Sequence, residues 1–403
     1  DRFYHVILPT DRHLIQFINE LGLSDMLRWK RTRTGFYVDK TFYSLSNGLE
    51  FLRFHPLSFL SKCKLAFTIL YCSRIKHWRH LERIPVADWL RKIGGQATYE
   101  KIWKPLLLAK LGNEYKRVSA VFIWSYIARM FSAREGSTQK EMLGHISGGY
   151  KTLFDRLADE ITIADGKIKT ATNVKHIAAN PNGGLVLEID NVKEHFDKVI
   201  FTSPVDVLQR ITNAELVSLQ RRGEQVEYLG VICMVLVTRK PLVPYYIVNI
   251  ADARVPFTGI IGMSNLADPS ETAGLHLTYL PKYIHSDSEL FAQSDEEIRA
   301  IFFEGLRVIL PDWEQHGVEA VHINRARRVQ PLQVLNYSQL VPRVESNHSD
   351  FFVLNTTQFT HMTLNNNEVI RAVDEFLLQR GATFNQPGRT ASANSTTPAS
   401  RYA

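Results

Sequence analysis

One segment near the C-terminal end limits the folds open to this chain more than any other. It joins four apolar residues, 351–354, to a polar loop and then to a helix with apolar residues on one face. Four consecutive apolar residues are typical of a strand buried on both faces. Thr363 or Asn365 is expected to cap the helix, since their side-chain oxygens accept from its first N–H groups. The N-terminus of such a helix can hold an anion or an electron-rich ring, and the alternative is a purely structural strand and helix.

Length and composition are those of an ordinary globular protein of more than one domain. The chain has 403 residues, 45% hydrophobic and 22% charged, with a net charge of +7. The positive charge is spread along the chain. Its densest cluster, 28–33, is interpreted as a solvated helix end, with contact to an acidic surface as the alternative, and no nucleic-acid motif surrounds it. The three cysteines and the scattered histidines have no ligand spacing, so neither a disulfide framework nor a metal site is expected. A reducing cytoplasm fits best.

Residues 1–135 have mostly helical patterns, which is not how a doubly wound sheet begins. Helices are predicted over 11–22, 57–77, 86–93, 98–111 and 118–134. A hairpin is predicted at 34–44, a break in the fourth helix at Pro105, and a cap for the first helix at Thr10 or Asp11. The helix over 57–77 contains too many basic residues to span a membrane. It is predicted to pack on its own domain, with a membrane surface or an apolar substrate cavity as alternatives.

Strand patterns dominate after His145. Gly148 and Gly149 precede a helix, and a β-meander follows and ends in a buried strand at 199–201. A second, largely antiparallel sheet is predicted over 228–280. These patterns alone predict an α/β protein of two interleaved domains without a local catalytic signature.

The order of these parts resembles that of the flavin-dependent amine oxidase superfamily, which includes protoporphyrinogen oxidases and phytoene-desaturase-type enzymes. The resemblance extends over roughly residues 1–380. It is carried by 3–5, 21–23, 35–39, 148–150, 196–204, 354–356 and 363–365. Residues 245–250 and the early hairpin further suggest a bacterial branch of FAD-dependent oxidoreductases. In such proteins a GxGxxG fingerprint precedes the position where this sequence starts, so the chain is expected to lack the N-terminal unit that binds the cofactor pyrophosphate.

The resemblance implies a mixed α/β (α+β) fold in which an incomplete, Rossmann-like FAD-binding domain is interleaved with a helical and antiparallel-sheet substrate domain. The implied parts are a mainly helical substrate part (1–144), the FAD-domain meander and return strand (145–212), the substrate-domain sheet and helix (213–335), the C-terminal FAD-domain strand and helix (336–380), and a disordered tail (381–403).

The resemblance also implies positions for an FAD cofactor. The implied contacts are Gly148, Gly149, Val174, Ser203, Pro204, Asn355, Thr356, Thr363, Leu364 and Asn365. Val174 corresponds to backbone beside the adenine, and the 203–204 pair to the strand passing the adenosine half. Asn355 and Thr356 correspond to a Gly-Asp of the family near the ribityl chain, so a hydrogen bond replaces an ionic contact. Residues 363–365 correspond to the helix start that faces the flavin carbonyl.

The implied reaction passes a hydride to the flavin from an amine or from an apolar polyene or porphyrinogen-like substrate. Trp103, Lys104, Tyr245 and Tyr246 are the candidate substrate contacts. At most one of the two tyrosines can face a cavity, since neighbouring strand residues alternate between faces.

Two alternatives remain open. The first is a flavin-dependent sugar mutase similar to UDP-galactopyranose mutase, for which Arg325, Arg327 and Arg328 form the candidate arginine cluster. The second is a truncated, non-catalytic remnant. Either enzyme is expected to bind a small-molecule substrate and no nucleic acid. A cytoplasmic location is expected, with peripheral contact at the inner membrane face as an alternative. The oligomeric state is left open.

Overall fold

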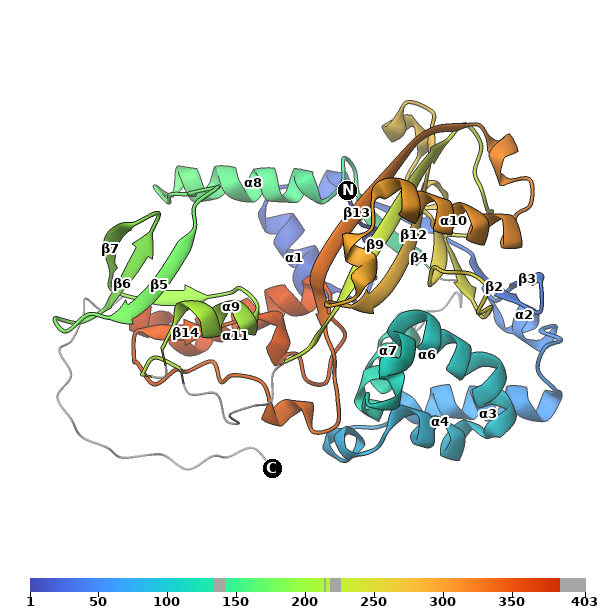
Figure 1. The fold of residues 1–403 in the computed structure, drawn as a ribbon, viewed down its shortest axis with the longest axis horizontal. Helices are drawn as coiled ribbons and strands as arrows, with labels where there is room; N and C mark the ends of the chain where they lie inside the picture. Colours follow the sequence, from blue (N-terminus) through green and yellow to red (C-terminus); the bar gives the residue numbers. More distant parts are fainter. Residues whose placement is uncertain (133–141, 214, 218–225, 385–403) are drawn as a thin grey trace. The chain divides into compact units, whose positions relative to one another are not determined.

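The structure is a computed structural model that describes residues 1–132, 142–213, 215–217 and 226–384. The chain forms two compact units whose sequences interleave (Figure 1). Unit 1 comprises Asp1–Ile168, Arg221–Val341 and Thr356–Arg371. Unit 2 comprises Lys169–Gln220, Pro342–Asn355 and the chain from Ala372 onward.

Unit 1 is built on a seven-stranded sheet with the strand order β13-β9-β12-β11-β10-β2-β3. Its strands are β2 (Thr34–Val38), β3 (Thr41–Ser44), β9 (Tyr228–Thr238), β10 (Ile247–Ile250), β11 (Gly259–Gly262), β12 (His276–His285) and β13 (Val318–Pro331). Neighbouring strands are antiparallel except β2 and β10, which are parallel. The antiparallel sheet predicted after residue 228 is confirmed. The structure adds the hairpin β2–β3, from early in the sequence, to one edge of it.

Strand β9 separates two hydrophobic cores because successive side chains point to opposite faces of a sheet. Ile232 and Met234 belong to the core that also contains apolar residues of α10 (Asp295–Ile309). Val231 and Cys233 belong to a different core, on the other face. The face bearing Val231 is the one that carries the tyrosines described below.

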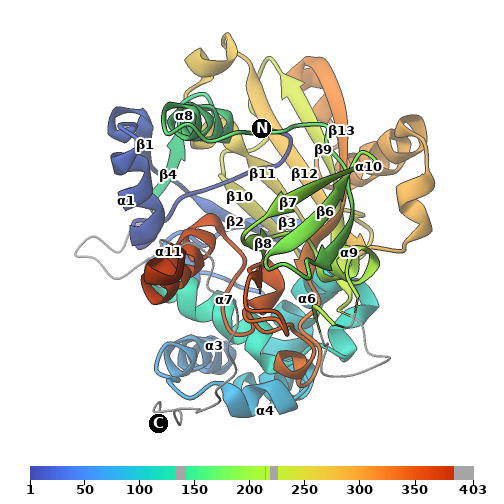
Figure 2. The same cartoon turned by 90° about the vertical axis from the view of Figure 1, so that its left-hand side faces the viewer.

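The helices of unit 1 include a group that packs beside the sheet. The helices are α1 (Arg12–Glu20), α2 (Gly48–Leu52), α3 (Phe59–Cys72), α4 (Val86–Gly94), α5 (Gln96–Thr98), α6 (Lys104–Leu111), α7 (Ala120–Ser132), α8 (Tyr150–Ile163), α10 and the start of α11 (Asn366–Phe384). Helices α3, α4, α6 and α7 lie side by side in both views (Figures 1 and 2). Trp89, Trp103 and Trp124 are part of the core that they share.

A kink or break was predicted at Pro105, and the structure instead shows a π-turn just before it. Tyr99–Trp103 form a π-helix, and α6 starts immediately after it, so that Pro105 stands in the first turn of α6. The Lys104 N–H bonds to the Tyr99 carbonyl, five residues back, and this wider turn accommodates the proline, which has no N–H to donate.

Two further features complete unit 1. Strand β1 (Leu27–Arg31) pairs antiparallel with β4 (Met142–Ile146). The glycine pair that precedes α8 has positive φ, +78° at Gly148 and +80° at Gly149, which residues with a side chain rarely adopt. The helix predicted after these glycines is confirmed.

Unit 2 contains two small sheets. Strands β5 (Val174–Ala179), β6 (Leu185–Ile189) and β7 (Val192–Phe196) form the predicted meander. Strands β8 (Val199–Phe201) and β14 (Phe351–Val353) pair in parallel, and α9 (Val205–Ile211) follows β8. All three residues of β14 are buried, which confirms the strand predicted from the apolar run. Helix α11 continues to Phe384, beyond the predicted start of the tail at 381. Residues 385–403, which make up most of the predicted tail, lie outside the described part of the chain.

Gly305 in α10 is packed so closely that a methyl group does not fit. A Cβ atom there would lie 2.3 Å from Cδ of Pro256 and 3.0 Å from Cε1 of Phe257. We expect Gly305→Ala to lower the free energy of unfolding by about 1–3 kcal/mol, the usual cost of overpacking, although alanine favours a helix by about 1 kcal/mol. Urea unfolding followed by tryptophan fluorescence measures the change. Gly48→Ala, where no atom lies within 4 Å of the new Cβ, is the control, and an equal loss in both variants would contradict this account.

Candidate functional site

The start of α11 carries the cap that the sequence predicted. Asn365 accepts a hydrogen bond from the Glu368 N–H at 3.1 Å, and its Nδ2 donates to the Thr363 carbonyl at 2.8 Å. The first four N–H groups of a helix have no partner within it, and the aligned peptide dipoles add partial positive charge at this end. The Asn365 cap pairs with only one of these N–H groups. The remaining groups and the dipole still favour a negatively charged or electron-rich partner at the start of α11.

A hollow of about 320 Å³ lies beside this helix start, within unit 1. It is lined by residues from the start of α1, from α7 and from the loop before α11, and is called here the α11 hollow. These residues are Thr10, Asp11, Trp124, Ser125, Ala128, Arg129, His361, Met362, Thr363, Asn367 and Glu368. Small-molecule sites begin at about 300 Å³, so the α11 hollow is large enough for part of an organic ligand.

An ion pair lies in the wall of the α11 hollow. Arg129 on α7 lies 2.9 Å from Oδ1 of Asp11, and the Leu8 N–H donates to Oδ2 of Asp11 at 2.9 Å. Asp11 is 3% exposed, and burial raises the pKa of its carboxyl although Arg129 opposes the rise. The predicted cap of α1 was wrong. Asp11 does stand at the N-cap position, but its carboxylate bonds Leu8 and Arg129 instead of the first turn of the helix.

A second, much smaller hollow adjoins the first, and Met362 lines both. Its volume of about 10 Å³ is that of one water site. Two of the predicted cofactor residues, Thr356 and Leu364, line it together with Gln333. Nε2 of Gln333 donates to the Phe359 carbonyl at 2.8 Å, whereas its buried Oε1 has no partner among the described residues. An unpaired buried acceptor costs about 1–3 kcal/mol, which a bound donor would recover.

A cluster of tyrosines with one lysine lies on the sheet face that bears Val231. Its members are Tyr4, Tyr126, Tyr283 and Lys110, and it is called here the tyrosine cluster. The hydroxyls of Tyr4 and Tyr283 are 3.1 Å apart, and Nζ of Lys110 lies 3.1 Å from the centroid of the Tyr283 ring. Tyr126 hydrogen-bonds to Gln330, and both residues line the smaller hollow. The cluster therefore continues from the wall of that hollow.

The pKa values of the residues in the tyrosine cluster differ strongly from their ordinary values. Burial lowers the pKa of Lys110 to about 7, and no described carboxylate forms an ion pair with its amine. Burial also raises the pKa values of Tyr4, Tyr126 and Tyr283, so these phenols keep their protons. At neutral pH, Lys110 is thus the member of the cluster that can take up or release a proton.

The cofactor residues predicted in unit 2 are partly brought together. Nδ2 of Asn355 donates to the Ser203 carbonyl at 3.0 Å. Pro204 stands at the start of α9, and Val174 is the half-buried first residue of β5. In unit 1, the Gly148 N–H donates to the Glu271 carboxylate at 3.2 Å, so it already has a partner. Which of these residues contact a cofactor stays a prediction.

The four predicted substrate residues lie apart from both hollows. Trp103 is buried in the helical core, and Lys104 forms a surface ion pair of 2.8 Å with Glu100. Tyr245 packs in the core beside α10, whereas Tyr246 is buried in the core on the opposite face. The predicted alternation of the two tyrosines is therefore observed. Tyr246 shares its core with Tyr4 and Tyr283, and Trp103 shares the helical core with Tyr126.

Sequence reasoning missed both the ion pair and the tyrosine cluster. Asp11 and Arg129 are 118 positions apart, and no local pattern links them. Lys110 gave one usable signal, since it interrupts the apolar run 106–111 of a helix. A single lysine in such a run suggests an amine held in apolar surroundings.

Comparison with known proteins identifies a matching protein family and several solved structures of similar fold. Residues 1–330 match the flavin containing amine oxidoreductase family. No curated protein is similar in sequence. Solved structures of similar fold include the following three. A candidate protoporphyrinogen oxidase from Exiguobacterium sp. 255-15 is 15% identical, with 95% of this chain and 87% of that chain covered and a TM-score of 0.67. Putrescine oxidase bound to putrescine is 15% identical, with 94% and 87% covered and a TM-score of 0.66.

The third is reduced UDP-galactopyranose mutase, which is 11% identical, with 84% of this chain and 73% of that chain covered and a TM-score of 0.61. At these identities the likeness establishes the fold, and the mixed α/β class predicted from the sequence is confirmed.

In the described part of the chain, no group of three His, Cys, Asp or Glu side chains is placed to hold a metal ion.

The pairing of Asp11 with Arg129 gives a pH-dependent prediction. Arg129→Met leaves a buried carboxylate without its counter-charge, so the free energy of unfolding should fall by about 3–5 kcal/mol at neutral pH. The raised pKa of Asp11 means that the folded state binds this proton more tightly than the unfolded state, so stability falls as pH rises through that pKa. The deficit should therefore shrink on acidification. Asp11→Asn combined with Arg129→Met is the control, and a deficit independent of pH would contradict the assignment.

Lys110 should show its low pKa in its chemical reactivity. Only the neutral amine is acylated, so trace labelling with acetic anhydride over a pH series, read by peptide mass spectrometry, titrates each lysine. We expect the Lys110 midpoint to lie near 7, well below the ordinary lysine value of 10.5. Lys104, on the same helix and ion-paired at the surface, is the internal control. Equal profiles for the two lysines would show that the amine is not held in apolar surroundings.

Proposed function

Because the chain belongs to the flavin containing amine oxidoreductase family, we propose that it is an FAD-dependent oxidoreductase whose flavin ring is held beside the start of α11. The observation that carries the proposal is the family match over residues 1–330, to which the α11 hollow adds a site of suitable size. When bound, the flavin supplies the two-electron acceptor. The residues of the chain bind the flavin, orient the substrate and shield both from water.

The groups around the start of α11 suit a flavin. The pyrimidine ring of a flavin carries carbonyl acceptors and one N–H donor. The first turn of α11 offers N–H groups and a positive dipole end, which also favours the negative charge of a reduced flavin. The unpartnered Oε1 of Gln333 offers an acceptor. Thr363 and Asn367 are buried in the hollow wall, but their side chains already hydrogen-bond to Asn365, Leu14 and Glu368.

The tyrosine cluster supports a substrate without positive charge. Tyr283 presents a ring face of the kind that attracts an ammonium group. That position is already taken by Lys110, whose amine lies 3.1 Å from the ring centroid. An amine substrate would compete with the chain's own amine for that ring face, whereas an apolar polyene or porphyrinogen-like ring would meet aromatic surface. We therefore favour the apolar substrate, and an amine is the second choice.

The sugar-mutase alternative has less support. It calls for free arginines that can hold a diphosphate. Arg325 is ion-paired with Asp295 and donates to the Gln293 carbonyl at 2.9 Å. Arg327 lies over the Phe291 ring, 4.8 Å from its centroid. Neither arginine lines the two hollows described above.

Flavin uptake tests the proposal directly. The purified chain mixed with FAD and freed of excess should show the oxidised-flavin band near about 450 nm. Ala128 lines the α11 hollow, so Ala128→Phe should fill part of it and weaken FAD binding at least about tenfold, the equivalent of about 1.4 kcal/mol. Ala300→Phe, at an exposed position of α10, is the matched control. A folded chain that stays colourless with added FAD would contradict the proposal and favour a non-catalytic remnant.

A further inference from the structure

Helix α3 buries three polar side chains beside the apolar Leu65 and Cys72, and it exposes several large apolar side chains. Ser61, Lys62 and Thr68 are among its buried residues. Its exposed apolar residues, together with two from α2, form the surface called here the α2–α3 face. They are Leu49 (57% exposed), Leu52 (57%), Phe59 (73%), Leu60 (65%), Phe67 (60%), Leu70 (43%) and Tyr71 (39%). A contiguous exposed apolar surface of this kind marks a site of contact with a protein or a membrane.

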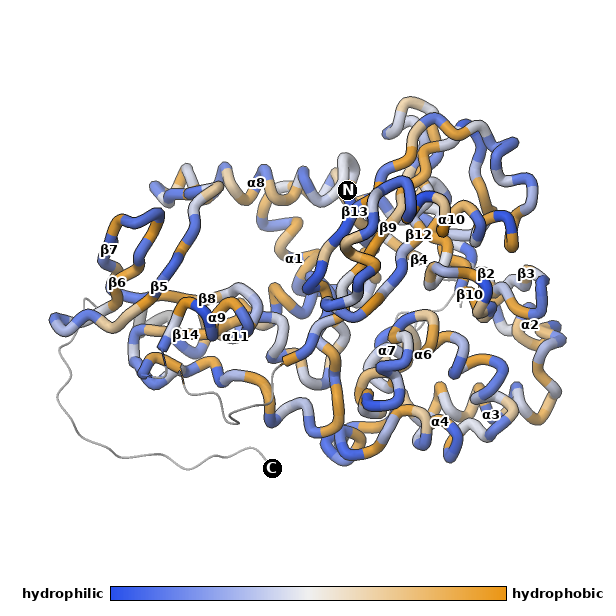
Figure 3. The backbone as a smooth tube through the Cα atoms, in the orientation of Figure 1, coloured by the Kyte–Doolittle hydropathy of each residue, from blue (hydrophilic) through white to orange (hydrophobic). Residues whose placement is uncertain are grey.

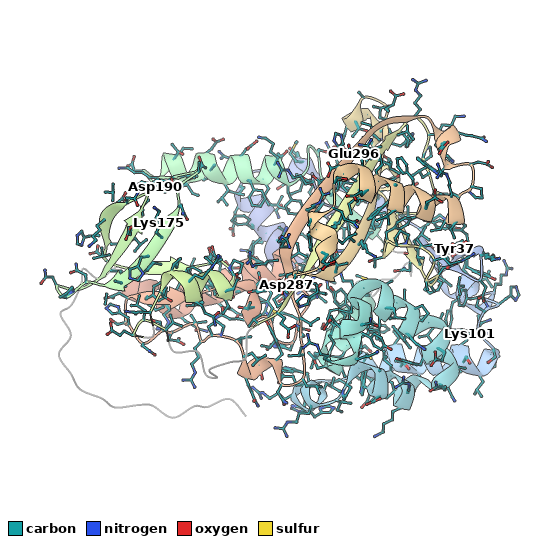
Figure 4. All side chains as sticks on the ribbon, viewed as in Figure 1. Tyr37, Lys101, Lys175, Asp190, Asp287 and Glu296 are labelled. Atoms are coloured by element: carbon teal, nitrogen blue, oxygen red, sulfur yellow. The ribbon has the colours of Figure 1, made fainter. Side chains whose placement is uncertain are left out.

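The buried polar groups are satisfied, so the orientation of α3 is fixed by specific contacts. Nζ of Lys62 donates to the Leu52 carbonyl at 2.6 Å, which ties α3 to the end of α2. Lys101, labelled in Figure 4, donates to the Pro56 carbonyl at 2.9 Å and holds the loop between the two helices. Oγ1 of Thr68 donates to the Lys64 carbonyl at 2.8 Å. The Thr68 bond lies within α3, whereas turning the apolar residues inward would break the bond from Lys62 to Leu52.

The charge along residues 51–80, which include all of α3, has one sign. Glu50 on α2 lies just outside this segment, and its carboxylate accepts hydrogen bonds from Ser44 and Ser46. Residues 51–80 contain no Asp or Glu, and the hydropathy along this segment can be followed in Figure 3. Apart from the buried Lys62, five basic residues of the segment are exposed, and none has a carboxylate partner in the described part of the chain. They are Arg53, Lys64, Arg74, Lys76 and Arg79. Exposed apolar side chains flanked by unpaired cations are typical of helices that lie on anionic membranes.

We propose that the α2–α3 face docks this protein on an anionic lipid bilayer, with α3 lying in the plane of the interface. Helix α3 has 14 residues and is therefore about 21 Å long, suited to lie on a membrane rather than to cross it. Among the described residues, no helix combines the length and apolar character needed to cross a bilayer. The apolar side chains enter the interface, and the five cations meet lipid phosphates.

A second copy of the chain is a poorer occupant. In a symmetric dimer the same surface patch contacts itself, so the five cations of one copy would face the five of the other. Like charges brought together at an interface oppose association. An anionic lipid surface instead complements both the apolar residues and the charge.

Vesicle co-sedimentation tests the proposal. The purified chain should bind vesicles with about one-quarter phosphatidylglycerol at least about tenfold more tightly than pure phosphatidylcholine vesicles. Binding should weaken when salt is raised to about 1 M, where the Debye length is about 3 Å. Phe67→Asp should lower the affinity at least about tenfold. Phe154→Asp on α8 is the matched control, because Phe154 is 61% exposed and Phe67 is 60% exposed.

Three outcomes would overturn the proposal. The first is no binding to anionic vesicles by the folded chain. The second is an equal effect of Phe67→Asp and Phe154→Asp. The third is a change of oligomeric state in Phe67→Asp, measured by light scattering, without any change in vesicle binding, which would assign the face to a second copy. None of these measurements requires bound flavin, so failure of this proposal is distinguishable from failure of the proposed function.

Discussion

Burial of strand β9 on both faces is the constraint on which unit 1 depends. All of its eleven residues except Val237 are buried, and the strand is paired along most of its length with β12 and β13. A central strand of this kind needs a hydrophobic layer on each side. One layer comes from α10 and the turn before it, and the other from residues of the N-terminal segment and of β12. Tyr4 and Tyr283 of the tyrosine cluster belong to the second layer.

The register between β9 and β12 explains how an apolar layer comes to contain phenols. Tyr279 stands opposite Val235 and Tyr283 opposite Val231. Residues directly opposite in an antiparallel pair share a face, so both tyrosines are placed beside Tyr4. A slip of one residue would turn them to the α10 side. The sheet therefore sets the position of the tyrosine cluster, and Lys110 joins it from α6. Lys110 loses hydration in this position, which is why its pKa falls.

Local sequence patterns were sufficient to predict most helices and strands, but not to predict which of them pack or pair with one another. The apolar run of β14 and the cap at Asn365 follow from short-range sequence signals, and both are observed. The hairpin β2–β3 was also predicted, yet nothing local indicates that β2 pairs in parallel with β10, more than 200 residues later. The same limit applies to the site. Asp11 looked like a helix cap because its spacing suited one, and only the fold brings Arg129 within reach.

Helix α3 shows a further limit of periodicity, because an amphipathic pattern does not state which face turns inward. In water alone, hydrophobic burial would favour Phe59, Leu60 and Phe67 inside. The structure instead buries Lys62 and gives its ammonium the Leu52 carbonyl at the end of α2. Burying a charged side chain while exposing aromatic ones is unfavourable for a free monomer in water. The proposed contact with a bilayer would remove this exposed apolar surface from water. The apolar pattern of α3 alone therefore does not predict which of its side chains are exposed.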